Sequence, residues 1–364
     1  MMRFPRRLPL GILVAITVLL IACDSSPSSR SGGSVFENCL PDNENLVDGG
    51  VPKDGIPALT DPSLVGPEAD EASYLADTSR VIGLLGGDAP LAVPHNILWS
   101  HEIVNLTWGD RPLAVTYCPL TGSSLAFDRS AVDGAEFGVS GLLLDNNLVM
   151  YDRRNDESLW PQMNRAATCG TAEGTGLEMV PVVEMRWSRW KALHPDTRVI
   201  SSETGHNFSY GQNSYPYGDY EQKNNDRLLF DRTPIDDRRP PKERILGIPA
   251  GADGGLALPF GILNNGAPAR VVEVTVGGRN VVVFWSRSAR AAMAFEVPAA
   301  FAVENGEIVD RETGSVWTVE GRAVEGPRRG EQLTPVRQAY VAFWFAWAVF
   351  HPETAIWTSS QSSS

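Results

Sequence analysis

From about residue 80 onward, the chain alternates short apolar runs with turn residues. The runs have the length of strands and are rich in valine and aromatic side chains, which favour β-structure. They cover residues 113–117, 124–128, 137–140, 148–151 and 180–185, and then 271–276, 280–285 and 291–297. Residues 186–193 and 339–350 are instead typical of short helices, and a His-Pro pair closes each. The pattern predicts a mainly β, β-rich α+β fold.

The chain also repeats itself in order. Arg80-Val-Ile-Gly-Leu84 matches Arg244-Ile-Leu-Gly-Ile248. The later matches join Val115, Phe127, Trp187, Trp190 and His194 to Val283, Phe295, Trp344, Trp347 and His351. We interpret residues 80–205 and 244–358 as two tandem, degenerate copies of a small strand-rich barrel or sandwich, each with one short helix.

Two segments outside the copies are expected to lack regular structure. Residues 36–79 contain Pro and Gly at positions that exclude a long helix, so we predict an irregular segment. Residues 206–243 form a predicted crossover loop that carries Tyr210, Tyr215, Tyr217 and Tyr220. These tyrosines either line a pocket or pack over a domain.

The first residues resemble a bacterial lipoprotein signal. Arginines precede an apolar run that is short for a membrane span, and the run ends in Leu20-Ile21-Ala22-Cys23. We predict a signal peptide over 1–22, lipidation of Cys23 and a flexible tether over 23–35. The protein would then be lipid-anchored to a membrane of the cell envelope and face the periplasm or exterior. An ordinary signal peptide or an uncleaved anchor is the alternative.

Charge and cysteine content indicate which binding partners and which cellular compartment to expect. A formal net charge of −13 disfavours nucleic acid as a partner by repulsion. Cys39, Cys118 and Cys169 remain beside Cys23, an odd number for a compartment that favours disulfides. The preferred pairing is Cys39 with Cys169, which leaves Cys118 free.

The candidate site lies in the first copy. His101, Glu102 and Cys118 bring an imidazole, a carboxylate and a thiol close together in sequence, whereas the position matching Cys118 in the second copy is Ser286. A hairpin centred on Gly109-Asp110 would pair His101 with Cys118 across two strands. The alternative is that Cys118 is a small buried apolar residue and that His101 and Glu102 form an exposed strand end.

Three functions fit these residues. His101, Cys118 and Met150 are a possible ligand set for copper or zinc. Alternatively, the protein would bind a small ligand in a cleft between the copies without catalysing a reaction. In the enzyme alternative, Cys118 is a nucleophile, His101 its base and Glu102 an orienting group, with Gln162 as a hydrogen-bond donor. We prefer metal or ligand binding to catalysis.

Several motifs together resemble one protein family. The segments 49–59, 101–105, 116–120, 137–141, 150–153, 158–162 and 194–197 occur in the order found in the domain of unknown function 3179 (DUF3179). The resemblance implies no particular activity. Many members have Cys-Pro-Leu-Cys-Gly where this chain has Cys118-Pro-Leu-Thr121-Gly122. The missing second thiol argues against two-cysteine redox or zinc chemistry.

Overall fold

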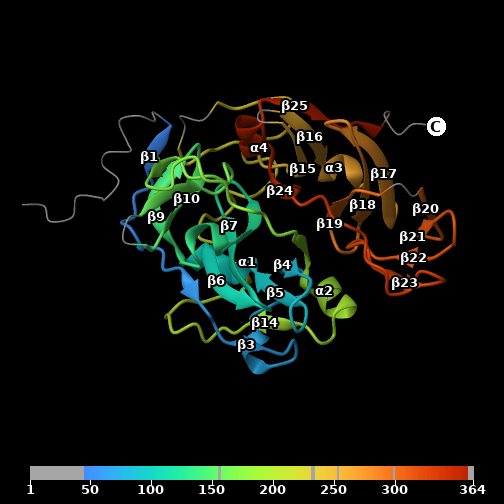
Figure 1. The fold of residues 1–364 in the computed structure, drawn as a ribbon, viewed down its shortest axis with the longest axis horizontal. Coiled ribbons are helices and arrows are strands. Elements are labelled where there is room, and N and C mark those ends of the chain that lie inside the picture. The colour runs from blue at the N-terminus through green and yellow to red at the C-terminus, as the bar shows by residue number, and fades with distance from the viewer. Residues whose placement is uncertain (1–44, 155–156, 231–233, 252–253, 298–299, 360–364) are drawn as a thin grey trace, which may run out of the picture. The chain divides into compact units, whose positions relative to one another are not determined.

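The computed structural model describes residues 45–154, 157–230, 234–251, 254–297 and 300–359. Within these residues the chain forms five β-sheets and four short α-helices (Figure 1). The predicted mainly β fold is therefore confirmed.

The elements of the first copy follow one another as strands with two helices among them. They are β4 (Arg80–Leu84), β5 (Leu91–Pro94), α1 (His95–His101), β6 (Ile103–Trp108), β7 (Arg111–Cys118), β8 (Ser123–Asp128), β9 (Phe137–Leu144), β10 (Asn147–Asp152), β11 (Ser158–Pro161), β12 (Cys169–Gly170), β13 (Val183–Arg186), α2 (Trp187–Leu193) and β14 (Arg198–Ile200). Short elements precede them at β1 (Leu46–Asp48), β2 (Leu59–Thr60) and β3 (Leu64–Val65).

The second copy has the same succession. Its elements are β15 (Arg244–Ala250), β16 (Gly254–Pro259), α3 (Phe260–Leu263), β17 (Ala269–Val276), β18 (Arg279–Ser286), β19 (Ala291–Phe295), β20 (Phe301–Glu304), β21 (Glu307–Asp310), β22 (Val316–Trp317), β23 (Ala323–Glu325), β24 (Tyr340–Phe343), α4 (Trp344–Phe350) and β25 (Glu353–Ile356).

Strand pairing is also the same in the two copies. β4 pairs antiparallel with β5 and β13, while β5 pairs parallel with β14. β15 likewise pairs antiparallel with β16 and β24, while β16 pairs parallel with β25. The orders β6-β7-β8 and β9-β10-β11-β12 recur as β17-β18-β19 and β20-β21-β22-β23. This topology is consistent with the predicted duplication, but each copy has two α-helices and not the single one expected.

The copies are joined through a shared sheet and shared cores. β8 of the first copy pairs with β24 of the second, so one sheet of eight strands runs through both. One core combines side chains of β6 to β11 with those of α4, and another combines side chains of β18 to β22 with those of α2. Side chains of both copies therefore contribute to each of these two cores.

A tryptophan anchors each of these two helices. The indole nitrogen of Trp190 donates a hydrogen bond to Thr197 Oγ1 at 2.8 Å, and that of Trp347 donates to Thr354 Oγ1 at 2.9 Å. Each indole lies directly against a glycine. A Cβ atom added at Gly83 or Gly247 would lie 2.1 Å from the ring of Trp190 or Trp347, respectively.

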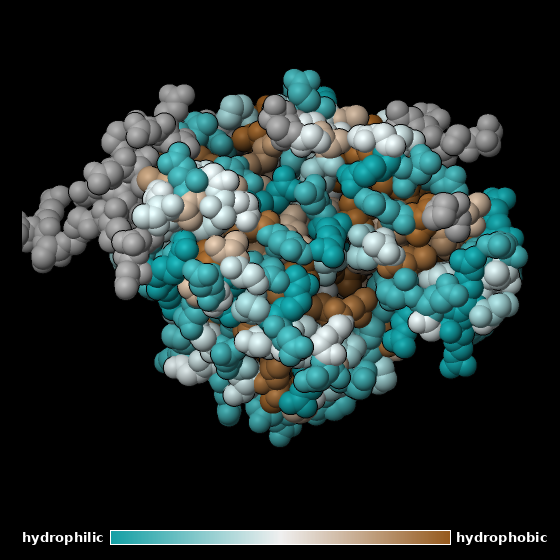
Figure 2. Space-filling model, in the orientation of Figure 1, coloured by the Kyte–Doolittle hydropathy of each residue, from teal (hydrophilic) through white to brown (hydrophobic). Residues whose placement is uncertain are grey.

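Hydrophilic residues predominate on the face shown in Figure 2, with apolar residues visible between them. In the part of the chain that the structure describes, no helix combines the length and apolar character needed to cross a bilayer.

The glycine–tryptophan contacts generate a stability prediction. Gly83→Ala and Gly247→Ala should each lower the free energy of unfolding by about 1–3 kcal/mol or more, because the added methyl group overpacks a rigid indole. Thermal unfolding followed by circular dichroism measures the effect. Gly211→Ala is the control, since a Cβ there has open space. Equal thermal midpoints for all three variants would contradict the packing described.

Candidate ligand-binding pocket

A sharp turn between α1 and β6 determines where the candidate residues lie. The chain changes direction within residues 97–104, with α1 ending at His101 and β6 beginning at Ile103. The linking residue is Glu102, whose φ of 56° is uncommon for a residue with a side chain. Its N–H donates to the Leu98 carbonyl at 2.8 Å, and its carbonyl accepts from the Tyr117 N–H at 2.9 Å.

The predicted hairpin register is present, but the predicted pair is not. Ile103 is opposite Thr116 and Trp108 is opposite Arg111, as a centre at Gly109-Asp110 requires. His101 belongs to α1, however, so the β6–β7 pairing begins only at Ile103 and His101 is not paired with Cys118. The imidazole Nδ1 lies 2.7 Å from the Pro57 carbonyl oxygen and Nε2 lies 2.7 Å from the Tyr210 hydroxyl oxygen.

His101 is therefore committed to other partners. Burial lowers the pKa of its imidazole to about 4, so the ring is neutral at pH 7. A carbonyl only accepts, so Nδ1–H donates to Pro57 and Nε2 accepts from Tyr210. Contrary to expectation, the structure does not offer His101 as a base for Cys118.

The predicted metal set is not assembled either. The His101 ring contacts the Tyr210 hydroxyl, and the Cys118 thiol contacts the Asn146 carbonyl. Met150 lies fully buried on β10 in the apolar core. Within the described residues no group of three or more His, Cys, Asp or Glu side chains is placed to hold a metal ion. The contacts of His101 and Cys118 therefore do not support the copper or zinc hypothesis.

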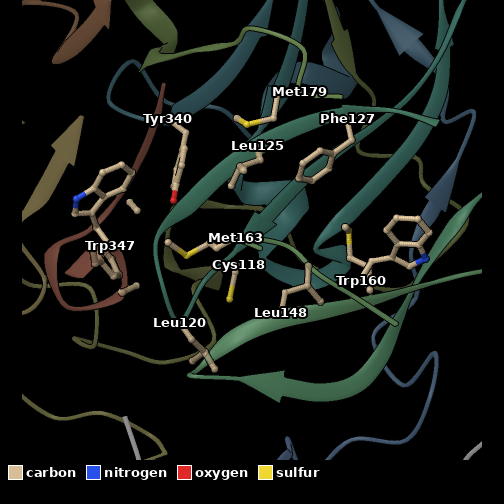
Figure 3. Close-up of a cluster of buried hydrophobic side chains, with 14 of the residues drawn as sticks. Cys118, Leu120, Leu125, Phe127, Leu148, Trp160, Met163, Met179, Tyr340 and Trp347 are labelled. Atoms are coloured by element: carbon tan, nitrogen blue, oxygen red, sulfur yellow. The ribbon is translucent and has the colours of Figure 1, made fainter. Parts of the chain in front are cut away.

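Cys118 is a buried thiol at the end of β7. It lies among Leu120, Leu148 and Met163 (Figure 3), and its Sγ contacts the Asn146 carbonyl oxygen at 3.6 Å. Burial, followed by the charge of Glu102, raises the pKa of the thiol to about 11. Such a thiol stays protonated at pH 7, which does not favour the nucleophile alternative.

The state of the cysteines can be compared with the expected pairing. Cys118 is free, and Cys169 is disulfide-bonded. The predicted partner, Cys39, lies outside the described residues, as does Cys23. The pairing itself therefore stays a prediction.

A buried polar network holds the turn after Cys118. The Thr121 and Ser123 hydroxyl oxygens are 2.8 Å apart, and Ser123 donates to Gln162 Oε1 at 2.5 Å. Asn147 donates to the same oxygen at 2.9 Å, while the Gln162 amide donates to Thr116 Oγ1 at 2.8 Å. Gln162 is thus a structural donor, and this network positions the loop that carries Leu120.

Beside this loop is an apolar pocket of about 240 Å³. Four segments that carry the family resemblance, 49–59, 101–105, 116–120 and 137–141, contribute to its wall. Leu142, Leu143 and Leu148 of β9 and β10 and three residues of the crossover loop complete it. Its lining residues are Gly49, Val51, Ile56, Glu102, Leu120, Val139, Gly141, Leu142, Leu143, Leu148, Tyr217, Leu229 and Phe230.

Two of the lining residues carry polar groups, Glu102 and Tyr217. Glu102 is only 6% exposed, and burial raises the pKa of its carboxyl to about 8. Burial also raises the pKa of Tyr217, and the neighbouring Glu102 and Cys118 raise it further. In the described part of the chain, neither the Glu102 carboxyl nor the Tyr217 hydroxyl has a hydrogen-bond partner. The pocket therefore combines apolar walls with two unused polar groups.

The fold and the pocket together define a mainly β protein with two halves of the same strand order and a pocket in the first half. Comparison of the sequence with family models identifies it more closely. The model described as "Protein of unknown function (DUF3179)" matches residues 53–354, and the chain belongs to this family. No curated protein matches the chain, and no solved structure matches it.

Sequence reasoning found Glu102 but not its surroundings. Tyr217, Leu229 and Phe230 lie about a hundred residues downstream of Glu102 and Cys118. The tyrosine-rich crossover loop was the available signal, and Tyr217 does line a pocket. The sequence did not indicate which of the tyrosines would do so.

The pKa of Glu102 predicts a pH-dependent gain in stability for Glu102→Gln. Folded Glu102 keeps its proton up to about pH 8, whereas an ordinary carboxyl releases it near pH 4.5. Between these pH values Glu102 ionises in the unfolded chain but not in the folded one. The free energy of unfolding therefore falls as the pH rises through this window. Glu102→Gln should raise the free energy of unfolding by about 3 kcal/mol at pH 7 and leave it nearly unchanged at pH 4.

Denaturant unfolding at the two pH values measures this gain. Glu325→Gln, on an exposed strand residue, is the control and should show no difference between them. A similar gain for Glu102→Gln at pH 4 and pH 7 would show that the carboxyl is not buried as described.

Proposed function

We propose that the first copy of this protein binds a compact, predominantly apolar molecule that carries one hydrogen-bond-accepting oxygen. The observation that carries the proposal is the carboxyl group of Glu102, which is buried in an apolar pocket without a partner. A buried carboxyl without a partner opposes folding. The backbone of Glu102 is also in an unfavourable conformation, with φ of 56°. A ligand that forms a hydrogen bond with this group would offset the free-energy cost of burying it. Strained backbone of this kind is typical of functional sites.

The shape and lining of the pocket define the ligand class. Leucine, isoleucine and valine side chains form most of the wall, so burial of apolar ligand surface supplies most of the affinity. With a pKa of about 8, Glu102 is mainly protonated at pH 7 and donates a hydrogen bond. The Tyr217 hydroxyl provides a second donor. Together they favour a carbonyl, ether or hydroxyl oxygen at one end of the ligand.

The protonation of Glu102 makes binding dependent on pH. 4-Phenyl-2-butanone, which has one carbonyl and no charge, should bind about tenfold more tightly at pH 6.5 than at pH 9.5, because ionised Glu102 cannot donate. Butylbenzene, which lacks the oxygen, should show little such change. Saturation-transfer NMR and calorimetry measure both.

Two variants test the assignment. Glu102→Gln keeps a donor at every pH, so it should bind the ketone and abolish the pH dependence. Leu143→Trp should fill the pocket and block both probes. If octylamine binds and binds more tightly at pH 9.5, the ligand class is wrong. If neither uncharged probe binds the wild-type protein at either pH, the proposed function is wrong.

We further propose that the protein is a lipid-anchored protein of the cell envelope. The Leu20-Ile21-Ala22-Cys23 sequence and the serine-rich segment after it support this location. The disulfide-bonded state of Cys169 also favours a compartment outside the reducing cytoplasm. The acidic net charge leaves the lipid as the means of attachment to an anionic membrane.

Replacing the lipidated residue tests the location. Cys23→Ser should move the protein from the membrane fraction to the soluble or uncleaved-precursor fraction, and it should abolish metabolic labelling with a palmitate analogue. Ser25→Ala, two residues on, is the control and should leave both unchanged. Palmitate labelling that persists in Cys23→Ser would contradict lipidation at this residue.

A further inference from the structure

A second cavity, of about 340 Å³, lies where the two copies meet. Six cationic side chains line it and only two carboxylates do, although the chain as a whole carries a net charge of −13. The cations are Arg80, Arg186, Lys223, Lys242, Arg244 and Arg290, and the carboxylates are Glu221 and Glu243. Such a local excess of one sign in a protein of the opposite sign calls for a physical reason.

Structural ion pairs account for part of this charge. The Glu184 carboxylate accepts from Arg80 at 2.6 Å and from Arg244 at 3.0 Å, and Lys223 lies 3.1 Å from Glu243. Lys242 donates to the Arg227 carbonyl at 2.7 Å and stands over the Tyr220 ring. These four cations therefore have partners within the protein.

The side chains of Arg186 and Arg290 differ from these four in their contacts. The backbone N–H of Arg186 donates to the Ala289 carbonyl at 3.0 Å, so the first copy and the second copy place these two arginines beside each other. Among the described residues neither guanidinium has a carboxylate or other hydrogen-bond partner. Arg290 is exposed, and its partial desolvation lowers the pKa of its guanidinium, which the like charges of Arg186 and Arg244 lower further.

The backbone at Arg290 adds an independent observation. Its φ is 49°, a left-handed conformation that favours glycine. The position related to it by the 168-residue repeat is Gly122, with φ of 60°. An arginine at this turn therefore costs backbone free energy and places a second positive charge next to Arg186. Neither cost improves the fold.

We infer that this cavity binds a small polyvalent oxyanion, with Arg186 and Arg290 as its principal ligands. Guanidinium groups bind phosphate and carboxylate oxygens through paired hydrogen bonds, and two unpaired guanidiniums that line one cavity match a polyvalent anion. Arg80 and Arg244 also line the cavity, but Glu184 and Glu221 pair with them. The site is separate from the apolar pocket and needs both copies, because each contributes one of the two ligands.

Calorimetry on the full-length protein in detergent tests this inference at low ionic strength. Inorganic phosphate, pyrophosphate and tricarballylate are the probes, and at least one should bind saturably with one site per chain. Preference for pyrophosphate would identify a phosphorylated ligand, and preference for tricarballylate a polycarboxylate. Arg186→Gln and Arg290→Gln should each weaken binding about tenfold or more.

Arg189→Gln is the matched control, because Arg189 is an exposed arginine of α2 that does not line the cavity. It should change the affinity by no more than about twofold. Without ligand, Arg186→Gln and Arg290→Gln should unfold at wild-type temperature or above, since a like-charge contact is removed. Absence of saturable binding to all three probes, or an equal loss in Arg189→Gln, would overturn the inference.

Discussion

The fold depends on one buried carboxylate, that of Glu184 on β13. Burial alone would raise its pKa, but the guanidinium groups of Arg244 and Arg80 lower it to about 2. Ser124 of β8 also donates to it, at 2.8 Å. A carboxylate this deep is tolerable only when its charge is compensated, so the strands that carry these groups must meet at this point. Because Arg80 begins β4 and Arg244 begins β15, the same ion network joins the two copies.

The apolar interior also joins the two copies. Two of the cores combine side chains of both copies, with α4 contributing to one and α2 to the other. Two copies in this arrangement cannot be separated without exposing both cores. The strand order is repeated, but the stable unit is the pair of copies.

Within this repeated frame the two copies differ in their chemistry. The turn after β7 in the first copy carries Cys118 and a buried network of hydroxyl and amide groups, while β18 in the second copy ends in Ser286. Glu102, with its uncompensated carboxyl, occurs in the first copy only. The cationic cavity depends instead on Arg186, at the end of β13 in the first copy, and Arg290, in the turn between β18 and β19 of the second copy. One copy thus holds the apolar pocket, whereas the junction between copies holds the excess positive charge.

The sequence alone determined the mainly β fold and the register of the β6–β7 hairpin, because both follow from local residue preferences and from the Gly109-Asp110 turn. It did not determine that His101 ends a helix, since a short apolar run fits either a helix or a strand. The sequence also did not determine the environments of Glu102 and Cys118. Tyr217 and Phe230 reach the pocket, and Tyr210 reaches His101, from about a hundred residues away. Burial by such distant segments sets the pKa values and the partners of these groups, so only the tertiary structure decided which of them share a pocket.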